Sequence, residues 1–145
     1  MMPNTYPLSF LELAGRLLLA MLLGAMIGWE RERASKPAGL RTNILVSLGS
    51  ATFALSLLQS QTGQESVDSL SRVVQGISTG VGFVGAGSIL KGDRTHGLTS
   101  AATVWISAAI GLGVSVGQWQ MGILVTVLTL FTLHVLKHVE RTRDN

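Results

Sequence analysis

The chain has 145 residues, of which 47% are hydrophobic and only 13% are charged, with a mean hydropathy of +0.44. An ordinary soluble domain carries charge on roughly 25% of its residues, so this composition excludes that class and predicts a single domain in a lipid bilayer. The absence of cysteine excludes disulfides, thiolate metal ligands and a cysteine nucleophile.

Five apolar segments follow one another along the chain. A helix needs about 20 mostly apolar residues to cross the hydrocarbon core, where backbone groups find no partners in lipid. Residues 1–10 lack the basic start and the cleavage site of a signal peptide, so the first apolar run is expected to stay as a span. The sequence predicts an all-α bundle of five transmembrane helices at residues 8–29, 43–58, 73–90, 98–116 and 119–136.

The basic residues between these segments predict the orientation of the bundle, because Lys and Arg collect on the cytoplasmic side of membrane proteins. Nine of them lie in the connections after the first and third segments and in the tail, whereas Arg72 alone lies on the other side. We therefore expect the N-terminus outside and the C-terminus in the cytoplasm. This role in orientation explains the basic residues behind the net charge of +3, so no nucleic-acid partner is expected.

Glycines recur four residues apart in three of the segments, which is the GxxxG spacing that lets helix backbones approach closely. Packing within the chain is favoured for the third and fourth segments, and a homodimer through the first pair stays open. The run from Gly80 to Gly85 also matches GxGxxG, but it lacks the strand and acidic residue of a dinucleotide site. The predicted packing positions are Gly24, Gly28, Gly76, Gly80, Gly82, Gly85, Gly87, Gly113 and Gly117.

Polar side chains inside the predicted spans follow helical periodicity. Glu12 and Arg16 stand four apart on one helix and are expected to form an ion pair at the outer leaflet. Two stripes of polar residues are expected to join helices, with the lining of a pore as the minority interpretation. The first stripe holds Asn43, Ser47 and Ser50, and the second holds Thr99, Thr103 and Ser107.

Metal-binding and catalytic patterns are weak. His134 and His138 have the spacing of a metal pair but no third ligand, so a surface role is expected for them. Carboxylates for a hard cation are limited to Glu12 in a span, Glu30 at a border and Asp93 in a short connection. No cofactor is predicted, magnesium stays open as an ion, and the lack of a serine, histidine and acid set predicts that the chain is not an enzyme.

Four stretches in a fixed order carry a resemblance to a known family: GWER from Gly28, AGLRTN from Ala38, GFVGAGSI from Gly82 and GLTSAATVW from Gly97. The chain resembles the MgtC/SapB family over about residues 17–136. The resemblance implies a bacterial inner-membrane protein associated with adaptation to low magnesium, acid tolerance and survival inside host cells. The best-known branch also has a cytoplasmic C-terminal domain, which is expected to be absent here because the sequence ends soon after Leu136.

The resemblance also implies a functional polar cluster at Glu30, Arg31, Arg41, Thr42, Asn43, Thr99 and Trp105. Arg41 beside Glu30 is expected to close it, as a structural clamp or as a ligand site. Thr99 departs from the virulence-associated branch, whose pattern is GLNTAA, because the amide is lost. The implied function is regulation of other membrane proteins, ATP synthase among them, and the alternative is a magnesium or other cation transporter or channel that acts as an oligomer.

Overall fold

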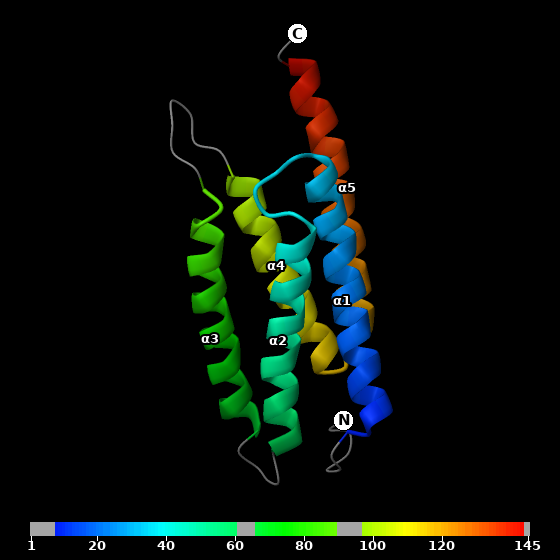
Figure 1. The fold of residues 1–145 in the computed structure, drawn as a ribbon, viewed down its shortest axis with the longest axis vertical. Helices are drawn as coiled ribbons and strands as arrows, with labels where there is room; N and C mark the ends of the chain where they lie inside the picture. The colour runs from blue at the N-terminus through cyan, green and yellow to red at the C-terminus, as the bar shows by residue number, and fades with distance from the viewer. Residues whose placement is uncertain (1–7, 61–65, 90–96, 144–145) are drawn as a thin grey trace.

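The computed structural model describes residues 8–60, 66–89 and 97–143, with only the backbone described at 66–67 and 136–143. Five helices run through these ranges, and successive helices point in opposite directions (Figure 1). The predicted all-α fold with five helices is therefore confirmed. The helices are α1 (Phe10–Arg33), α2 (Leu40–Ser60), α3 (Ser66–Ala86), α4 (Leu98–Ser115) and α5 (Trp119–Arg143).

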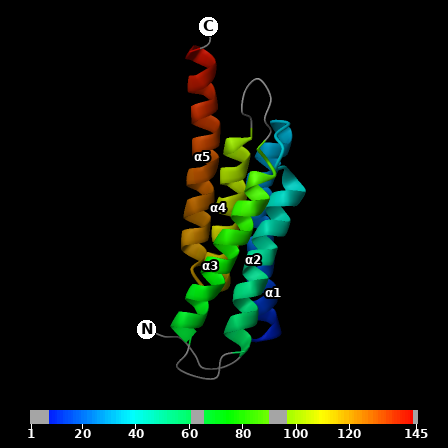
Figure 2. The same cartoon turned by 90° about the vertical axis from the view of Figure 1, so that its left-hand side faces the viewer.

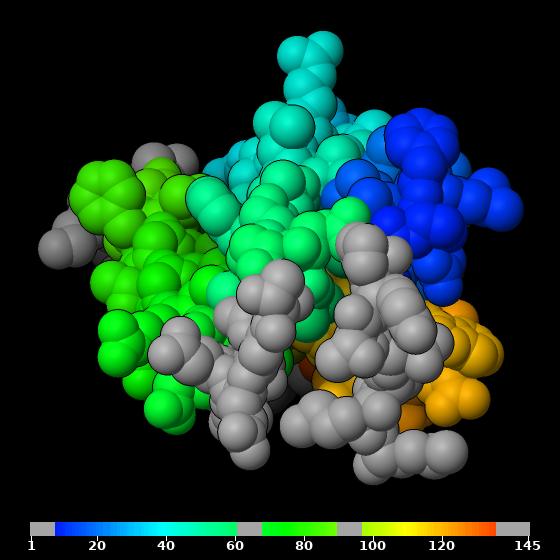
Figure 3. Space-filling model, turned by 90° about the horizontal axis from the view of Figure 1, so that it is seen from below, coloured from blue at the N-terminus to red at the C-terminus, as the bar shows by residue number. Residues whose placement is uncertain are grey.

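Three helices form the centre of the bundle. α1, α2 and α4 contact one another, whereas α3 lies against α2 and α4, and α5 lies against α1 and α4 (Figures 1 and 2). Seen along the bundle, α3 and α1 stand on opposite sides of α2 (Figure 3). α4 thus contacts all other helices, and the apolar core between α1, α2 and α4 consists of Ala20, Leu23, Ile27, Ala51, Ile110 and Val114.

Within the described residues, α1, α2 and α4 are long and apolar enough to cross a membrane, and the stretch Trp119–Val135 of α5 is a shorter apolar helix. Large apolar side chains such as Leu22, Phe53, Leu128 and Phe131 point outward and are exposed. A surface of this kind is stable against lipid and costly in water. The chain is a multi-pass membrane protein, while the crossing of α3 and the orientation of the bundle stay predictions.

Near the start of α1, Glu12 and Arg16 each bind another group, so the expected ion pair between them is wrong. The carboxylate of Glu12 accepts from the backbone N–H and hydroxyl of Ser9, both at 2.9 Å, and Ser9 caps the helix in return. Arg16 donates to the backbone carbonyl of Ser115 at the end of α4. Unpaired backbone groups at helix ends are strong partners, so each charge satisfies one of them and the described residues show no pair between the two.

α2 begins at Leu40, three positions earlier than expected, because α1 supplies its cap. The carboxylate of Glu32 accepts from the backbone N–H of Leu40 at 2.9 Å. Glu32→Ala is expected to lower the free energy of unfolding by about 1 kcal/mol, the usual cost of a lost helix cap. Unfolding in mixed detergent micelles, followed by tryptophan fluorescence, measures this, with exposed Arg33→Ala as the control. Equal stability of the two variants would contradict the cap.

α3 begins at Ser66 and ends at Ala86, so it lies several residues earlier in the chain than expected. Its end is tightened by a bond from the Ser88 backbone N–H to the carbonyl of Gly85, at 2.9 Å. The chain enters α4 at Gly97, whose φ of 95° is left-handed and whose absent Cβ would overlap the Ser88 carbonyl. Only glycine fits there without strain, and the end of α3 therefore abuts the start of α4.

Candidate functional site

The first two family stretches meet where α1 lies on α2. A Cβ added at Gly24 would stand 2.8 Å from the carbonyl oxygen of Asn43, and one added at Gly28 would stand 2.7 Å from the Cα of Leu40. Real Cβ atoms essentially never come that close, so only glycine permits this packing. The face of α1 that carries both glycines is covered by α2 of the same chain, which leaves it unavailable to a second copy.

Asn43 is the centre of the polar contacts between α2 and α4. Its side chain is fully buried, and its amide nitrogen donates to the backbone carbonyls of Ala38 at 3.0 Å and Gly39 at 2.9 Å. Its amide oxygen accepts from the Ser107 hydroxyl of α4 at 2.8 Å. Asn43 therefore fixes the α1–α2 connection and attaches it to α4, which is the role of a structural clamp.

The two polar stripes meet inside the bundle through Asn43 and Ser107, while Thr99 of the second stripe is exposed. Ser47 of α2 donates to the Ala20 carbonyl of α1 at 2.8 Å, and Thr103 of α4 donates to the carbonyl of Ser100 at 2.9 Å. Gly111 of α4 lies so close to the Ser47 carbonyl that a Cβ there would overlap it. These hydroxyls join helices or bond to their own backbone, and Ser50 of the same stripe faces α3 instead.

Arg31 is the buried charge of the predicted cluster. It is 5% exposed, and its Nη1 lies 3.4 Å from the carboxylate of Glu30, which is partly buried. An ion in such surroundings needs a partner, because charge is costly away from water. Among the described side chains, Glu30 forms this one ion pair, so Arg31 rather than Arg41 is its partner.

The other members of the predicted cluster lie apart from this buried centre. Thr42 is partly buried, Arg41 and Thr99 are exposed, and Trp105 is 49% exposed. Arg41 follows the Glu32 cap at the start of α2, and Thr99 lies in the first turn of α4. The structure thus brings Glu30 next to Arg31 and places Asn43 on Ser107, while the remaining members lie on or near the surface.

The other predicted packing glycines have varied surroundings. Among the described residues, no group lies within 4 Å of a Cβ added at Gly76, Gly80 or Gly82 of α3. Gly85 lies at ordinary contact distance from Ala101 of α4, and Gly113 lies against the side chain of Met121. The last two lie outside helices: Gly87 follows the end of α3, and Gly117 turns the chain out of α4 with a φ of 89°.

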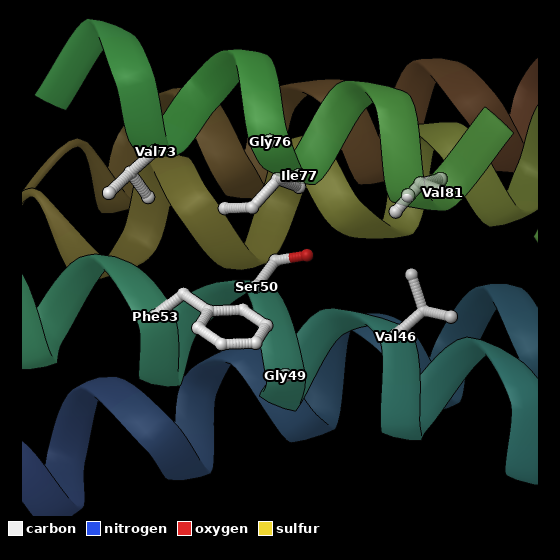
Figure 4. A pocket seen from close by; sticks show the side chains of 9 residues that line it. Val46, Gly49, Ser50, Phe53, Val73, Gly76, Ile77 and Val81 are labelled. Carbon is white, nitrogen blue, oxygen red and sulfur yellow. The ribbon is translucent and has the colours of Figure 1, made fainter.

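An apolar groove of about 420 Å³ separates α2 from α3 (Figure 4). Val73, Ile77 and Val81 of α3 point across it toward α2, and the hydroxyl of Ser50 points into it (Figure 4). Ser50 is 5% exposed. The remaining lining residues are Val46, Gly49, Phe53, Gly76 and Gly80.

No group of three metal-ligating side chains occurs within the described part of the chain. Glu12 is engaged at the start of α1 and His134 is exposed on α5. Asp93 and the side chain of His138 lie outside the described residues. The candidate site is therefore a buried polar joint, with Arg31 and Glu30 at one end and Asn43 at its centre.

The four stretches lie within the part of the chain, residues 17–142, that matches the MgtC family in a comparison against known families. The chain belongs to the MgtC family. No solved structure matches it. In this structure, the first two stretches form the joint of α1 and α2, and the last two form the contact between the end of α3 and the start of α4.

Three curated relatives illustrate this membership. Protein SrpB of Synechococcus elongatus is 46% identical over 92% of this chain and 79% of its own length. YhiD of Escherichia coli K12, whose name describes a candidate magnesium transporter, is 42% identical over 83% of this chain and 58% of its own. Protein MgtC of Salmonella typhimurium is 45% identical over 79% of this chain and 48% of its own. The chain thus matches about half the length of the last two relatives.

Two residues of this joint were not among the candidates from the sequence: Glu32, which caps α2, and Gly111, which lies against the Ser47 carbonyl. Arg16 was expected to pair with Glu12 and instead binds the end of α4. Gly111 lies one helical turn from Ser107 on the buried face of α4, so the polar stripe extended by one turn would have found it. The roles of Glu32 and Arg16 depend on contacts with another helix, which no local pattern encodes.

Proposed function

We propose that this chain is an inner-membrane regulator that binds other membrane proteins through the groove between α2 and α3. The observation that carries the proposal is the glycine face of α3. Gly76 and Gly80 stand at GxxxG spacing, line the groove and have no neighbour within 4 Å of an added Cβ. The GxxxG face of α1, in contrast, is filled by α2 of the same chain.

The occupant proposed for the groove is a transmembrane helix of a different protein. Gly49 on α2 faces Gly76 and Gly80 on α3, so a third helix backbone can approach both walls closely. The Ser50 hydroxyl points into the groove and can form a hydrogen bond with a polar group of a partner helix. An acyl chain has no group that can form this bond. The groove is concave, whereas a symmetric pair of copies needs a self-complementary surface, which favours a different protein over a second copy.

The proposed orientation places the joint of α1 and α2 in the cytoplasm. Arg33, Lys36 and Arg41 are exposed at this end of the bundle, which also holds the end of α3 and the start of α4 (Figure 1). A cluster of basic side chains at one end follows the usual cytoplasmic bias. Family membership supports a role in adaptation to low magnesium or acid, with ATP synthase as one candidate partner.

Gly76→Leu tests the groove, and Gly15→Leu is the matched control. Neither glycine has a neighbour within 4 Å of an added Cβ, so both variants are expected to fold. In membranes from cells limited for magnesium, Gly76→Leu is expected to reduce the amount of partner recovered at least about tenfold. A tenfold loss of affinity corresponds to about 1.4 kcal/mol of binding free energy. Gly15→Leu should recover the partner as wild type does, measured by quantitative mass spectrometry after crosslinking.

Three outcomes contradict the proposal. Full recovery of the partner with Gly76→Leu would exclude the groove as the docking face. If wild type captured no other protein while the cells still depended on it for growth at low magnesium, regulation through a membrane partner would be excluded. Capture of a second copy alone, sensitive to Gly76→Leu, would make the groove a homo-oligomer interface.

Cation transport by an oligomer is the alternative, because the name of YhiD describes a candidate magnesium transporter. Glu30 is a carboxylate within the buried joint, as the partner of Arg31. Purified protein in liposomes with an enclosed magnesium indicator distinguishes the two functions. Flux that Glu30→Ala abolishes would establish transport, whereas no flux from folded protein would favour the regulator.

A further inference from the structure

Two buried polar atoms in the described residues have no hydrogen-bond partner, the Nε of Arg31 and the hydroxyl oxygen of Ser100. Arg31 is 5% exposed and Ser100 is 1% exposed, so solvent does not satisfy them. Buried groups of this kind are rare, and each needs an explanation such as a bound water, ion or ligand. Arg31 belongs to α1 and Ser100 to α4, two helices in direct contact.

The packing of the joint places these two residues at the same height in the bundle. Gly24 of α1 lies on Asn43, and Asn43 accepts the hydrogen bond of Ser107 of α4, so Gly24 and Ser107 are level. Arg31 lies seven residues beyond Gly24, and Ser100 lies seven residues before Ser107 in the antiparallel helix. Both steps rise about 10.5 Å toward the same end of the bundle, and both residues belong to the buried faces of their helices.

The same end of the bundle holds the beginning of α4, which has no side-chain cap (Figure 1). Its N-cap is Gly97, which has no side chain to accept a hydrogen bond, and the first backbone bond of the helix runs from Ala101 to the Gly97 carbonyl. The backbone N–H groups of Leu98, Thr99 and Ser100 therefore have no acceptor within the helix. Leu98 and Thr99 are exposed, so this turn is open from outside.

The unpartnered groups at this place are donors. They comprise the guanidinium N–H of Arg31, the hydroxyl of Ser100 and the free N–H groups of α4, whose dipole adds about half a positive charge. Glu30 balances part of the charge of Arg31 through one contact at 3.4 Å. Several donors around a weakly positive centre fit an oxyanion with a single negative charge, since phosphate oxygens accept several such bonds.

We propose that the start of α4 and the guanidinium of Arg31 together bind a phosphate oxyanion, with Ser100 as a direct ligand. The phosphodiester of a lipid headgroup and free phosphate share this chemistry. The lipid fits better on two counts: its phosphodiester carries one negative charge, and Leu98, 61% exposed beside the site, offers an apolar surface to acyl chains. The site is separate from the groove between α2 and α3 and does not depend on it.

The experiment uses the full chain, purified in a neutral detergent and stripped of lipid. One arm adds inorganic phosphate at fixed ionic strength, because surface charges are screened by salt. The other arm compares phosphatidylglycerol with diacylglycerol, which has the same chains and no phosphate. The thermal midpoint from tryptophan fluorescence and the lipid retained in native mass spectrometry give the affinity.

Wild type is expected to bind phosphatidylglycerol saturably, and diacylglycerol much more weakly. Ser100→Ala removes one hydrogen bond to a charged group and is expected to weaken binding about tenfold or more, and Arg31→Gln should weaken it further. Arg33→Gln removes an exposed charge two residues away and should change the affinity less than twofold.

A response to inorganic phosphate alone would make a free phosphate group the ligand of the same site. Binding of neither probe, or equal binding by wild type and Ser100→Ala, would overturn the proposal and leave a buried water as the partner of both atoms. Ser100→Ala changes one buried hydroxyl to hydrogen, so it keeps the test valid if Arg31→Gln fails to fold.

Discussion

Gly111→Ala is expected to destabilise the protein by about 3 kcal/mol, at the upper end of the usual cost of overpacking a well-packed interior. The added methyl would overlap the backbone carbonyl of Ser47, and backbone cannot rotate away as a flexible side chain can. α4 must then separate from α2, which also strains the hydrogen bond between Ser107 and Asn43. Unfolding by a denaturing detergent in mixed micelles, followed by tryptophan fluorescence, measures the change.

Gly15→Ala is the matched control for this change. Gly15 lies within α1 and has no neighbour within 4 Å of an added Cβ. The same substitution there should leave the stability unchanged or raise it by up to about 1 kcal/mol, because alanine has the higher helix propensity. If Gly111→Ala matched Gly15→Ala, the close contact between α4 and α2 would be excluded.

Asn43→Ala is expected to cost about 3 kcal/mol. It removes three hydrogen bonds, leaves the Ser107 hydroxyl without its acceptor and opens a cavity at the centre of the joint. A single hydrogen bond between membrane helices contributes only about 0.6 kcal/mol on average, so the stranded carbonyls and the cavity supply most of the effect. The same detergent unfolding measures it, with Thr52→Ala as the control on the exposed face of α2.

A double-mutant cycle of Asn43→Ala and Ser107→Ala separates the contribution of the Asn43–Ser107 hydrogen bond from the other effects of Asn43→Ala. The coupling energy is expected to lie near 0.6 kcal/mol and below about 1.7 kcal/mol, the range of such bonds in membrane proteins. Additive losses of stability from Asn43→Ala and Ser107→Ala would show that the two side chains do not interact. That result would contradict the hydrogen bond from the Ser107 hydroxyl to the Asn43 amide oxygen at 2.8 Å.

These two predictions affect how loss of function in this family member is interpreted. Asn43 was a functional candidate by family resemblance, yet its contacts are those of a residue that holds helices together. A variant that loses activity at Asn43 is therefore expected to lose stability as well. Gly76→Leu should separate the two effects, because its position has space for a side chain and its proposed role is in binding.

The class of the protein and the order of its helices could be predicted from local properties of the sequence. Apolar length, the lack of charge within segments and the glycine spacing are local properties, and the bilayer makes such segments helical because no other backbone partner is present. The same reasoning found Asn43, Ser47, Thr103 and Ser107, whose periodicity places them on single helix faces. Four ordered stretches also identified the family, which the comparison confirmed.

Which of these helix faces meet, and which group each charge contacts, could be learned only from the packing of the helices. The pair at Gly24 and Gly28 packs within the chain, whereas an equal spacing at Gly76 and Gly80 stays without a neighbour. Glu12 and Arg16 have ideal spacing for an ion pair, but each binds a backbone group at a helix end. Spacing fixes only the direction of a side chain from its own helix, and its partner depends on how the helices are placed around it.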